Sequence, residues 1–120
     1  MGLFYDTYAI LSLIDGNEDY GKYRSDIITT GILNFAELYN VFLRSKGKKT
    51  ADYWARKLNL NIVEMDKDSI IKAVRLRFDN KKENLSPADC IGYFLALKNK
   101  MKFLTGDEKF KNKENVEFVK

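Results

Sequence analysis

The chain alternates short apolar runs with longer segments that carry apolar residues on one helical face. The short runs are rich in β-branched and aromatic residues and predict strands at 2–5, 27–30, 61–65, 102–105 and 116–119. The longer segments predict helices at 8–14, 31–44, 50–58, 67–78 and 87–97. Strands separated by helices indicate an α/β fold with a mostly parallel sheet of about five strands covered on both faces. No linker or repeat interrupts this order, so we expect a single domain spanning residues 1–120.

The segment 31–44 has an unusually wide apolar face. On a helical wheel its apolar side chains cover more than half of the circumference. They are Ile32, Phe35, Ala36, Leu38, Tyr39, Phe42 and Leu43. The remaining polar stripe consists of Asn34, Glu37, Asn40 and Arg44. This stripe faces either solvent or a cleft, and Glu37 is a ligand candidate only in the second case. A basic turn is expected at 45–49.

The helix predicted at 67–78 follows the third strand. Asp66 stands before it as the capping residue of an amphipathic helix. The apolar positions of this helix are Ile70, Ile71, Val74, Leu76 and Phe78. The following segment, 79–85, is the most loop-like part of the chain and is expected to form a rim.

Two absences in the composition restrict the chemistry. The chain contains no histidine and one cysteine, Cys90. A histidine general base, a Ser-His triad, a histidine-ligated zinc site and an internal disulfide are therefore excluded. Cys90 lies among apolar helix positions and is expected to be core packing. Any bound metal must be held by oxygen ligands, which favours Mg²⁺, Mn²⁺ or Ca²⁺.

The charge and hydropathy of the chain indicate its surroundings only broadly. The formal net charge is +4, which mildly favours a polyanionic partner. No apolar run approaches the length of a membrane span, and no signal-peptide pattern is visible. We therefore expect a cytoplasmic protein with no membrane association.

Acidic residues stand at the ends of predicted elements. Asp6 follows the first strand, Asp107 follows the fourth, and Asp89 lies in the first helical turn after Ser86 and Pro87. In a parallel sheet these positions share one edge, where ligands bind in open α/β folds. Helix capping is the alternative, because Asp6 and a Ser86–Asp89 box are both good N-terminal signals.

Four short motifs, in order along the chain, carry a resemblance to a known family. The first is Tyr5-Asp6-Thr7, and the second is the sequence Asn-Phe-Ala-Glu-Leu at 34–38. The third spans 87–96 around Asp89, and the fourth spans 103–110 around Asp107. Together they resemble the PIN-domain nucleases, and the length is similar to that of the compact VapC-type toxins. The resemblance implies a three-layer α/β/α fold.

The family resemblance also implies an activity. Its members use Mg²⁺ or Mn²⁺ and metal-activated water to hydrolyse RNA phosphodiester bonds. By matching position, the acidic cluster is Asp6, Glu37, Asp89 and Asp107. Asp6 and Asp89 are expected as direct metal ligands, with Thr7 and Thr105 as hydrogen-bonding supports.

Further expectations concern partners and the surroundings of the site. Arg44, Lys46 and Lys109 are candidate contacts to the RNA backbone. Glu108 or Asn112 stands where some family members carry a further polar residue, and neither has an assigned role. The family pairing implies a small antitoxin partner and a homodimer.

Three alternative functions compete with the nuclease. A phosphatase of the haloacid dehalogenase type needs a second acid two residues after Asp6, where Tyr8 stands. A phosphoryl-accepting receiver domain would use Asp66 as its acceptor, with Asp6 helping to hold Mg²⁺, but it leaves Glu37 and Asp89 without a role. A PIN-like fold could also act only as a binding module, and the complete acidic set argues against that.

Overall fold

The computed structural model describes residues 2–120, and every expected strand and helix is present in it in the predicted order. The strands are β1 (Leu3–Tyr5), β2 (Ile28–Gly31), β3 (Leu60–Val63), β4 (Lys102–Thr105) and β5 (Val116–Phe118). The α-helices are α1 (Thr7–Ile14), α2 (Ile32–Lys46), α3 (Lys48–Lys57), α4 (Lys67–Asp79) and α5 (Pro87–Lys98). Three short 3₁₀ helices lie in the connections, at η1 (Glu18–Tyr23), η2 (Lys81–Glu83) and η3 (Glu108–Phe110).

The five strands run parallel, as predicted. Backbone hydrogen bonds join them in two groups, β1-β4-β5 and β2-β3. β2 lies beside β1, and the Thr30 hydroxyl donates a hydrogen bond to the Tyr5 carbonyl at 2.6 Å. A side-chain bond thus connects the two groups where the backbone ladder is interrupted. Because all strands point the same way, their carboxyl ends lie along one edge.

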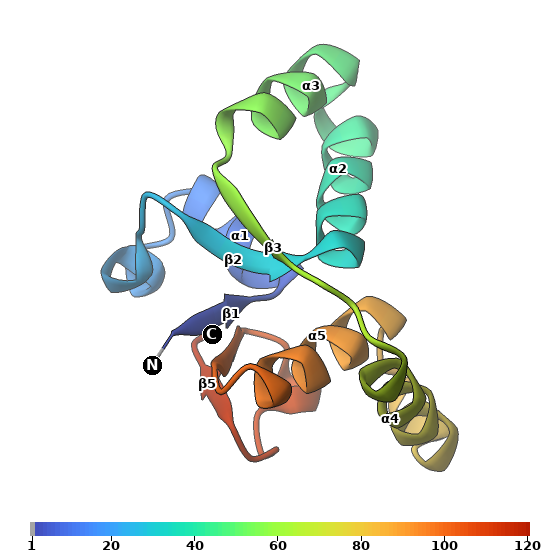
Figure 1. Ribbon diagram of the computed structural model, residues 1–120. Helices are drawn as coiled ribbons and strands as arrows, with labels where there is room; N and C mark the ends of the chain where they lie inside the picture. Colours follow the sequence, from blue (N-terminus) through green and yellow to red (C-terminus); the bar gives the residue numbers. More distant parts are fainter. Residues whose placement is uncertain (1) are drawn as a thin grey trace.

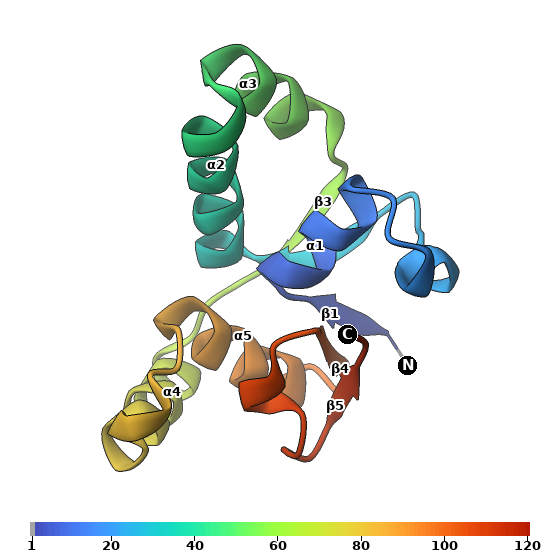
Figure 2. The same cartoon turned by 180° about the vertical axis from the view of Figure 1, so that it is seen from behind.

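The alternation of side chains along the strands fills a separate core on each face of the sheet. Phe4 and Phe103 point into one core, which α4 and α5 cover. Their neighbours Tyr5 and Leu104 point into the other core, which α1, α2 and α3 cover. Figures 1 and 2 show α4 and α5 on one side of the strands and the α2–α3 hairpin projecting from the other. The predicted α/β/α layering is therefore confirmed.

The prediction of a turn over residues 45–49 is wrong, because the observed connection is much shorter. α2 continues to Lys46 and α3 begins at Lys48, so a single residue, Gly47, separates them. Gly47 has a φ of 91°, a backbone conformation that residues with a Cβ rarely adopt. Because glycine supplies the reversal alone, the lysines around it join the helices.

The predicted buried faces of α2 and α4 are wrong in part. Ile32 is 44% exposed, whereas Asn34, assigned to the polar stripe, is 1% exposed. On α4, the residues packed most deeply are Ser69 and Ala73, and the larger Val74 and Phe78 point outward. The reason is close packing of α4 on α5, which small side chains permit.

Within residues 2–120, no helix combines enough length with enough apolar character to cross a membrane.

Candidate metal centre

Asp6 stands where β1 passes into α1, at the carboxyl edge of the sheet. Its side chain is fully buried, and Oδ1 accepts a hydrogen bond from the Ala9 amide at 2.8 Å. Asp6 is thus the N-cap of α1, as the alternative reading expected. The other oxygen, Oδ2, is buried and has no hydrogen-bond partner within residues 2–120. Capping therefore uses only one of the two carboxylate oxygens.

Glu37 is the sixth residue of α2, and two hydroxyl groups hold its carboxylate. The Thr7 hydroxyl donates to Oε1 at 2.9 Å, and the Ser86 hydroxyl donates to Oε2 at 3.0 Å. Thr7 belongs to α1 and Ser86 precedes α5, so Glu37 joins three helices. Two residues of the α2 polar stripe, Asn34 and Glu37, therefore face this junction, whereas Asn40 and Arg44 are exposed to solvent.

Asp89 completes a ring of hydrogen bonds around the same junction. Its backbone amide donates to the Ser86 hydroxyl at 3.3 Å, which makes Ser86 the N-cap of α5. The Asn34 side-chain amide lies 3.4 Å from Asp89 Oδ1 and 3.3 Å from the Thr7 hydroxyl. The ring therefore runs from Asp89 through Asn34, Thr7, Glu37 and Ser86 back to Asp89.

Asp107 approaches the cluster from the end of β4. Its amide donates to the buried Thr105 hydroxyl at 3.0 Å, and its Oδ1 accepts a hydrogen bond from the Lys109 amide at 3.0 Å. Asp107 is thus the N-cap of η3, and its side chain is partly exposed.

The electrostatics of the four carboxylates reflect their proximity. Burial raises the pKa of Asp6 above its usual range. The nearby Thr105 hydroxyl, which forms no hydrogen bond with Asp6 within residues 2–120, and the Ala9 amide oppose the shift, and Asp107 and Glu37 add to it. Burial likewise raises the pKa of Asp89, and the charge of Asp6 is the next largest cause, followed by Glu37 and Asp107. Each of these two carboxyl groups therefore resists ionisation while the others are charged.

Lys109 is a basic residue whose charge acts on Asp89. Its charge lowers the pKa of Asp89, and its ammonium group donates to the Asn84 carbonyl at 3.1 Å. Arg44 and Lys46, by contrast, lie in the last turn of α2. At a rise of about 1.5 Å per residue, Arg44 is roughly 10 Å further along the helix than Glu37. The three candidate RNA contacts therefore do not form one group.

The donor set fits a hard divalent cation. The side chains of Asp6 and of the hydrogen-bonded ring present oxygens, apart from the Asn34 amide nitrogen, and Asp6 Oδ2 lacks the partner that a buried charged oxygen requires. A cation would supply that partner and relieve the repulsion between Asp6 and Asp89. In the arrangement of residues 2–120, however, no three acidic side chains converge into a complete ligand set. Glu37 in particular is turned toward the two hydroxyls.

Asn34 and Ser86 were not assigned to the site from the sequence. Asn34 lies three residues before Glu37, so the helical period places both on one face of α2. This spacing could have indicated that Asn34 lies near Glu37, but it could not show that Asn34 is buried. Ser86 was recognised as a cap, but its second hydrogen bond depends on how α2 and α5 pack.

Asp66 occupies an equivalent position at another strand end and behaves differently. It follows β3 and caps α4 through hydrogen bonds from the Ser69 amide at 2.9 Å and the Ser69 hydroxyl at 2.7 Å. Lys98 forms an ion pair with it at 3.2 Å. The bonds from Ser69, more than the charge of Lys98, lower the pKa of Asp66 to about 2. Both carboxylate oxygens thus have partners.

Comparison with known proteins connects this geometry to a family. A family model described as the PIN domain matches residues 3–116. No curated protein is similar enough in sequence to count as a match. Solved structures do match, although their sequence identities show likeness of fold alone.

Three solved structures illustrate that likeness. The toxin VapC20 of Mycobacterium tuberculosis, described as cleaving the sarcin–ricin loop, has a TM-score of 0.77 and 14% identity over 99% of this chain and 100% of its own. VapBC2 of Rickettsia felis, solved on a DNA fragment from its promoter, has a TM-score of 0.69 and 18% identity over 100% of both chains. A Klebsiella pneumoniae toxin–antitoxin complex has a TM-score of 0.67 and 16% identity over 98% of this chain and 96% of its own.

The family match covers nearly the whole chain, and the parallel sheet with acidic residues along its carboxyl edge agrees with it. The chain belongs to the PIN domain family.

Proposed function

We propose that this protein is an endoribonuclease that uses Mg²⁺ or Mn²⁺ to hydrolyse RNA phosphodiester bonds. One observation carries the proposal: Asp6 is wholly buried, one of its oxygens has no hydrogen-bond partner within residues 2–120, and its charge acts on the nearby carboxyl group of Asp89. A buried carboxylate without a partner for each oxygen lowers the free energy of unfolding unless a cation is bound, so its presence points to a binding role and not to a stabilising one. Membership of the PIN family supports the same conclusion.

The carboxylates divide into two groups by their hydrogen bonds. Asp6 and Asp89 would hold the cation directly, because the charge of Asp6 acts on Asp89 and Asp6 Oδ2 has no partner within residues 2–120. Glu37 and Asp107 would act around it. Glu37 is fixed by Thr7 and Ser86, so it would orient the attacking water, and Asp107 would add charge at the open side of the site.

Hydrolysis requires a water oxygen to attack phosphorus while one ester oxygen leaves with a proton. When bound, the divalent cation would lower the pKa of the attacking water and neutralise charge on the phosphate. Glu37 would accept a hydrogen bond from that water and align it. Lys109, whose charge acts on Asp89, would attract the neighbouring phosphate. Through their hydrogen bonds, Asn34 and Thr7 would hold the carboxylates of Asp89 and Glu37 in fixed positions relative to each other.

In this proposal the protein is the toxin of a type II toxin–antitoxin pair. The supporting observation is that structural neighbours include toxin–antitoxin complexes from Klebsiella pneumoniae and Rickettsia felis. A small antitoxin would cover the carboxylate edge and silence cleavage, and the toxin would form a homodimer.

Cleavage of RNA by two carboxamide variants tests the nuclease. Asp6→Asn and Asp89→Asn keep the size of the side chain but remove a charge, and asparagine also caps helices well. We expect each variant to lose Mn²⁺-dependent cleavage by at least about 100-fold, while its thermal stability without metal is unchanged or raised because repulsion is relieved.

Asp66→Asn is the matched control, because Asp66 also follows a strand and caps a helix. We expect it to retain cleavage. Full activity in both Asp6→Asn and Asp89→Asn would refute the metal site. RNA binding without cleavage by the wild type would favour a binding module, and Asp66-dependent labelling by acetyl phosphate would favour a receiver domain.

A further inference from the structure

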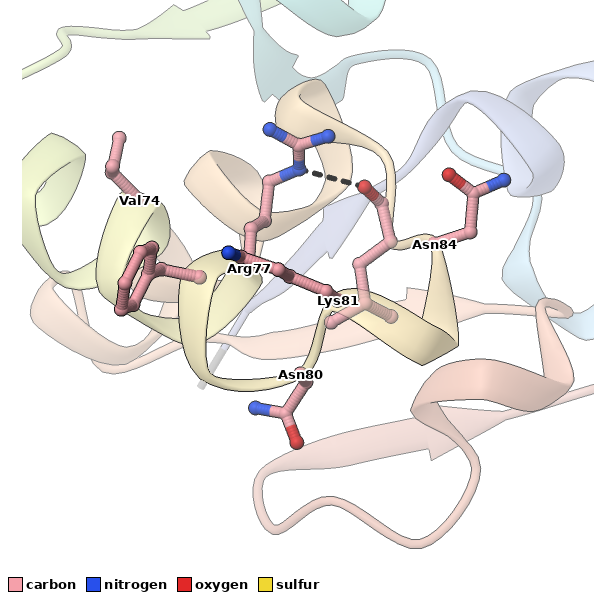
Figure 3. A pocket seen from close by; sticks show the side chains of 7 residues that line it. Val74, Arg77, Asn80, Lys81 and Asn84 are labelled. Carbon is pink, nitrogen blue, oxygen red and sulfur yellow. Dashed lines mark hydrogen bonds between the residues drawn. The ribbon is translucent and has the colours of Figure 1, made fainter.

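A hollow of about 300 Å³ lies where α4 ends and the chain turns toward α5. We call it the α4–η2 pocket. Figure 3 shows Val74, Arg77, Asn80, Lys81 and Asn84 around it. Phe78 and Leu85 complete the lining. Its walls thus combine apolar surface with amides and two cations, and no acidic side chain lines it.

Phe78 is the largest apolar side chain of this pocket and is not part of the core. It is 67% exposed, although a phenylalanine is usually buried. The Lys81 ammonium lies 4.5 Å from the centre of its ring. An exposed aromatic ring beside a cation is the type of platform on which unpaired nucleic-acid bases stack.

Charge distinguishes between a polyanion and a second copy of the chain as occupant. Residues 67–85 contain six basic and three acidic side chains. A two-fold contact through this surface would bring together two surfaces that both carry this excess of positive charge. A polyanion would instead be attracted, and Arg77 has a guanidinium group that could contact it. Arg77 Nε is fixed to the Leu85 carbonyl at 2.8 Å, and its terminal nitrogens have no partner within residues 2–120.

The two amides of the pocket retain hydrogen-bonding capacity. The Asn80 side-chain nitrogen donates to the Leu76 carbonyl at 2.8 Å, which leaves its oxygen as an acceptor. The Asn84 side chain forms no hydrogen bond with other residues of 2–120 and is exposed. Amide groups of this kind can recognise the edge of a base.

The pocket is structurally continuous with the carboxylate cluster. The Asn84 carbonyl accepts the hydrogen bond from Lys109, whose charge also acts on Asp89. Two residues after Asn84, the Ser86 hydroxyl binds Glu37. One short segment therefore forms a wall of the pocket and part of the ring at the proposed metal site.

We propose that the α4–η2 pocket binds one unpaired nucleotide of the RNA strand, with its base stacked on Phe78 and its phosphate contacted by Arg77 and Lys81. This inference rests on the proposed nuclease function. It adds a subsite that would favour single-stranded RNA and hold it beside the carboxylates.

Affinity for a labelled single-stranded oligoribonucleotide tests the subsite, measured by fluorescence anisotropy in EDTA, where no cleavage occurs. We expect Phe78→Ala to weaken binding by about fivefold or more, and Phe78→Trp to stay within about twofold of the wild type, because tryptophan also stacks. Tyr53→Ala is the matched control, since Tyr53 is a 49% exposed aromatic on α3, far from α4 in Figure 1. It should bind RNA as the wild type does.

Oligonucleotides that lack a single base identify the stacked nucleotide. One abasic position should weaken wild-type binding about as much as Phe78→Ala does, and should cost the Phe78→Ala variant nothing more. Unchanged RNA affinity in Phe78→Ala would overturn the subsite while leaving the nuclease intact, provided that wild-type cleavage is observed. A wild type that neither binds nor cleaves RNA would overturn both. A dimer that becomes a monomer on Phe78→Ala, by light scattering, would assign this surface to a second copy.

Discussion

At the scale of single residues, the most informative feature is the Asp6 carboxylate, in which one oxygen is hydrogen-bonded and the other is not. Asp6 Oδ1 caps α1, and Oδ2 has no partner in the described chain. Asp66 makes the comparison informative, because it has the same place in the fold and both oxygens bonded. The pKa of Asp6 is raised by burial and that of Asp66 is lowered by its hydrogen bonds. Position in the fold alone therefore does not create the site.

The raised pKa values predict how the metal-free protein responds to pH. A carboxyl group with a higher pKa in the folded state binds more protons there than in the unfolded state, so the free energy of unfolding falls as pH rises. For Asp6 and Asp89 this loss begins above the usual carboxyl range, near pH 4, and is complete above the raised values. Asp6→Asn removes one of the charges. We expect it to be more stable than the wild type at pH 8 by on the order of 1–2 kcal/mol.

Urea unfolding in EDTA at pH 5 and pH 8 measures this difference. Asp68→Asn serves as a control, because Asp68 is exposed and, within residues 2–120, forms an ion pair with Lys72. It should follow the wild type at both pH values. If Asp6→Asn shows the same decline from pH 5 to pH 8 as the wild type, repulsion at Asp6 is not a source of instability.

At the scale of secondary-structure elements, sequence periodicity gave the order of strands and helices but not every buried face. β1 and β4 were recognised because their apolar runs are short and end at acidic residues. The faces of α2 and α4 depend on contacts that no local pattern contains. Asn34 is buried because Thr7 and Asp89 lie against it, and Phe78 is exposed because α4 uses Ala73 to contact α5.

The same limit applies to the site. Asp6, Asp89 and Asp107 were predictable as residues at element ends, and the family resemblance added Glu37. The donors that fix Glu37 come from positions 7 and 86, which are distant in sequence and meet only after α1 and α5 pack against α2. The local sequence correctly identified Ser86 as a helix cap, but it did not reveal the hydrogen bond from Ser86 to Glu37.

Ser86 therefore allows capping and positioning to be separated. Glycine is nearly as good an N-cap as serine, with a cost of only a few tenths of a kcal/mol, but it cannot donate to Glu37. We expect Ser86→Gly to reduce the cleavage rate by about tenfold while its melting temperature changes little. Ser86→Thr retains the hydroxyl and should restore cleavage.

Cleavage rates at saturating RNA and thermal melts of the three proteins measure the two effects. A purely structural role for Ser86 would appear as parallel losses of stability and activity, or as full activity in Ser86→Gly. Either result would remove Ser86 from the positioning of Glu37.

At the scale of the whole molecule, one edge of the sheet collects the functional groups and the rest of the fold supports it. The parallel strands direct Asp6 and Asp107 to that edge, and α2 and α5 begin there. The net charge of +4 acts over a longer range and attracts polyanions. An uncontrolled nuclease with these properties would act on any accessible RNA, which is the physical reason to expect a dedicated inhibitor.

Purification from the source organism tests that expectation. If a small antitoxin covers the carboxylate edge, it should copurify with this chain and suppress cleavage of RNA. Removing it in denaturant and refolding the chain alone should restore Mn²⁺-dependent cleavage. The Asp6→Asn variant should still bind the partner but stay inactive after refolding, since it lacks the charge that the cation requires. Because salt screens charge but strengthens apolar contacts, binding that persists from low to high salt would indicate a largely apolar interface. If no small partner is recovered at any salt concentration, and the chain is active as purified, the toxin–antitoxin assignment is wrong while the nuclease assignment stands.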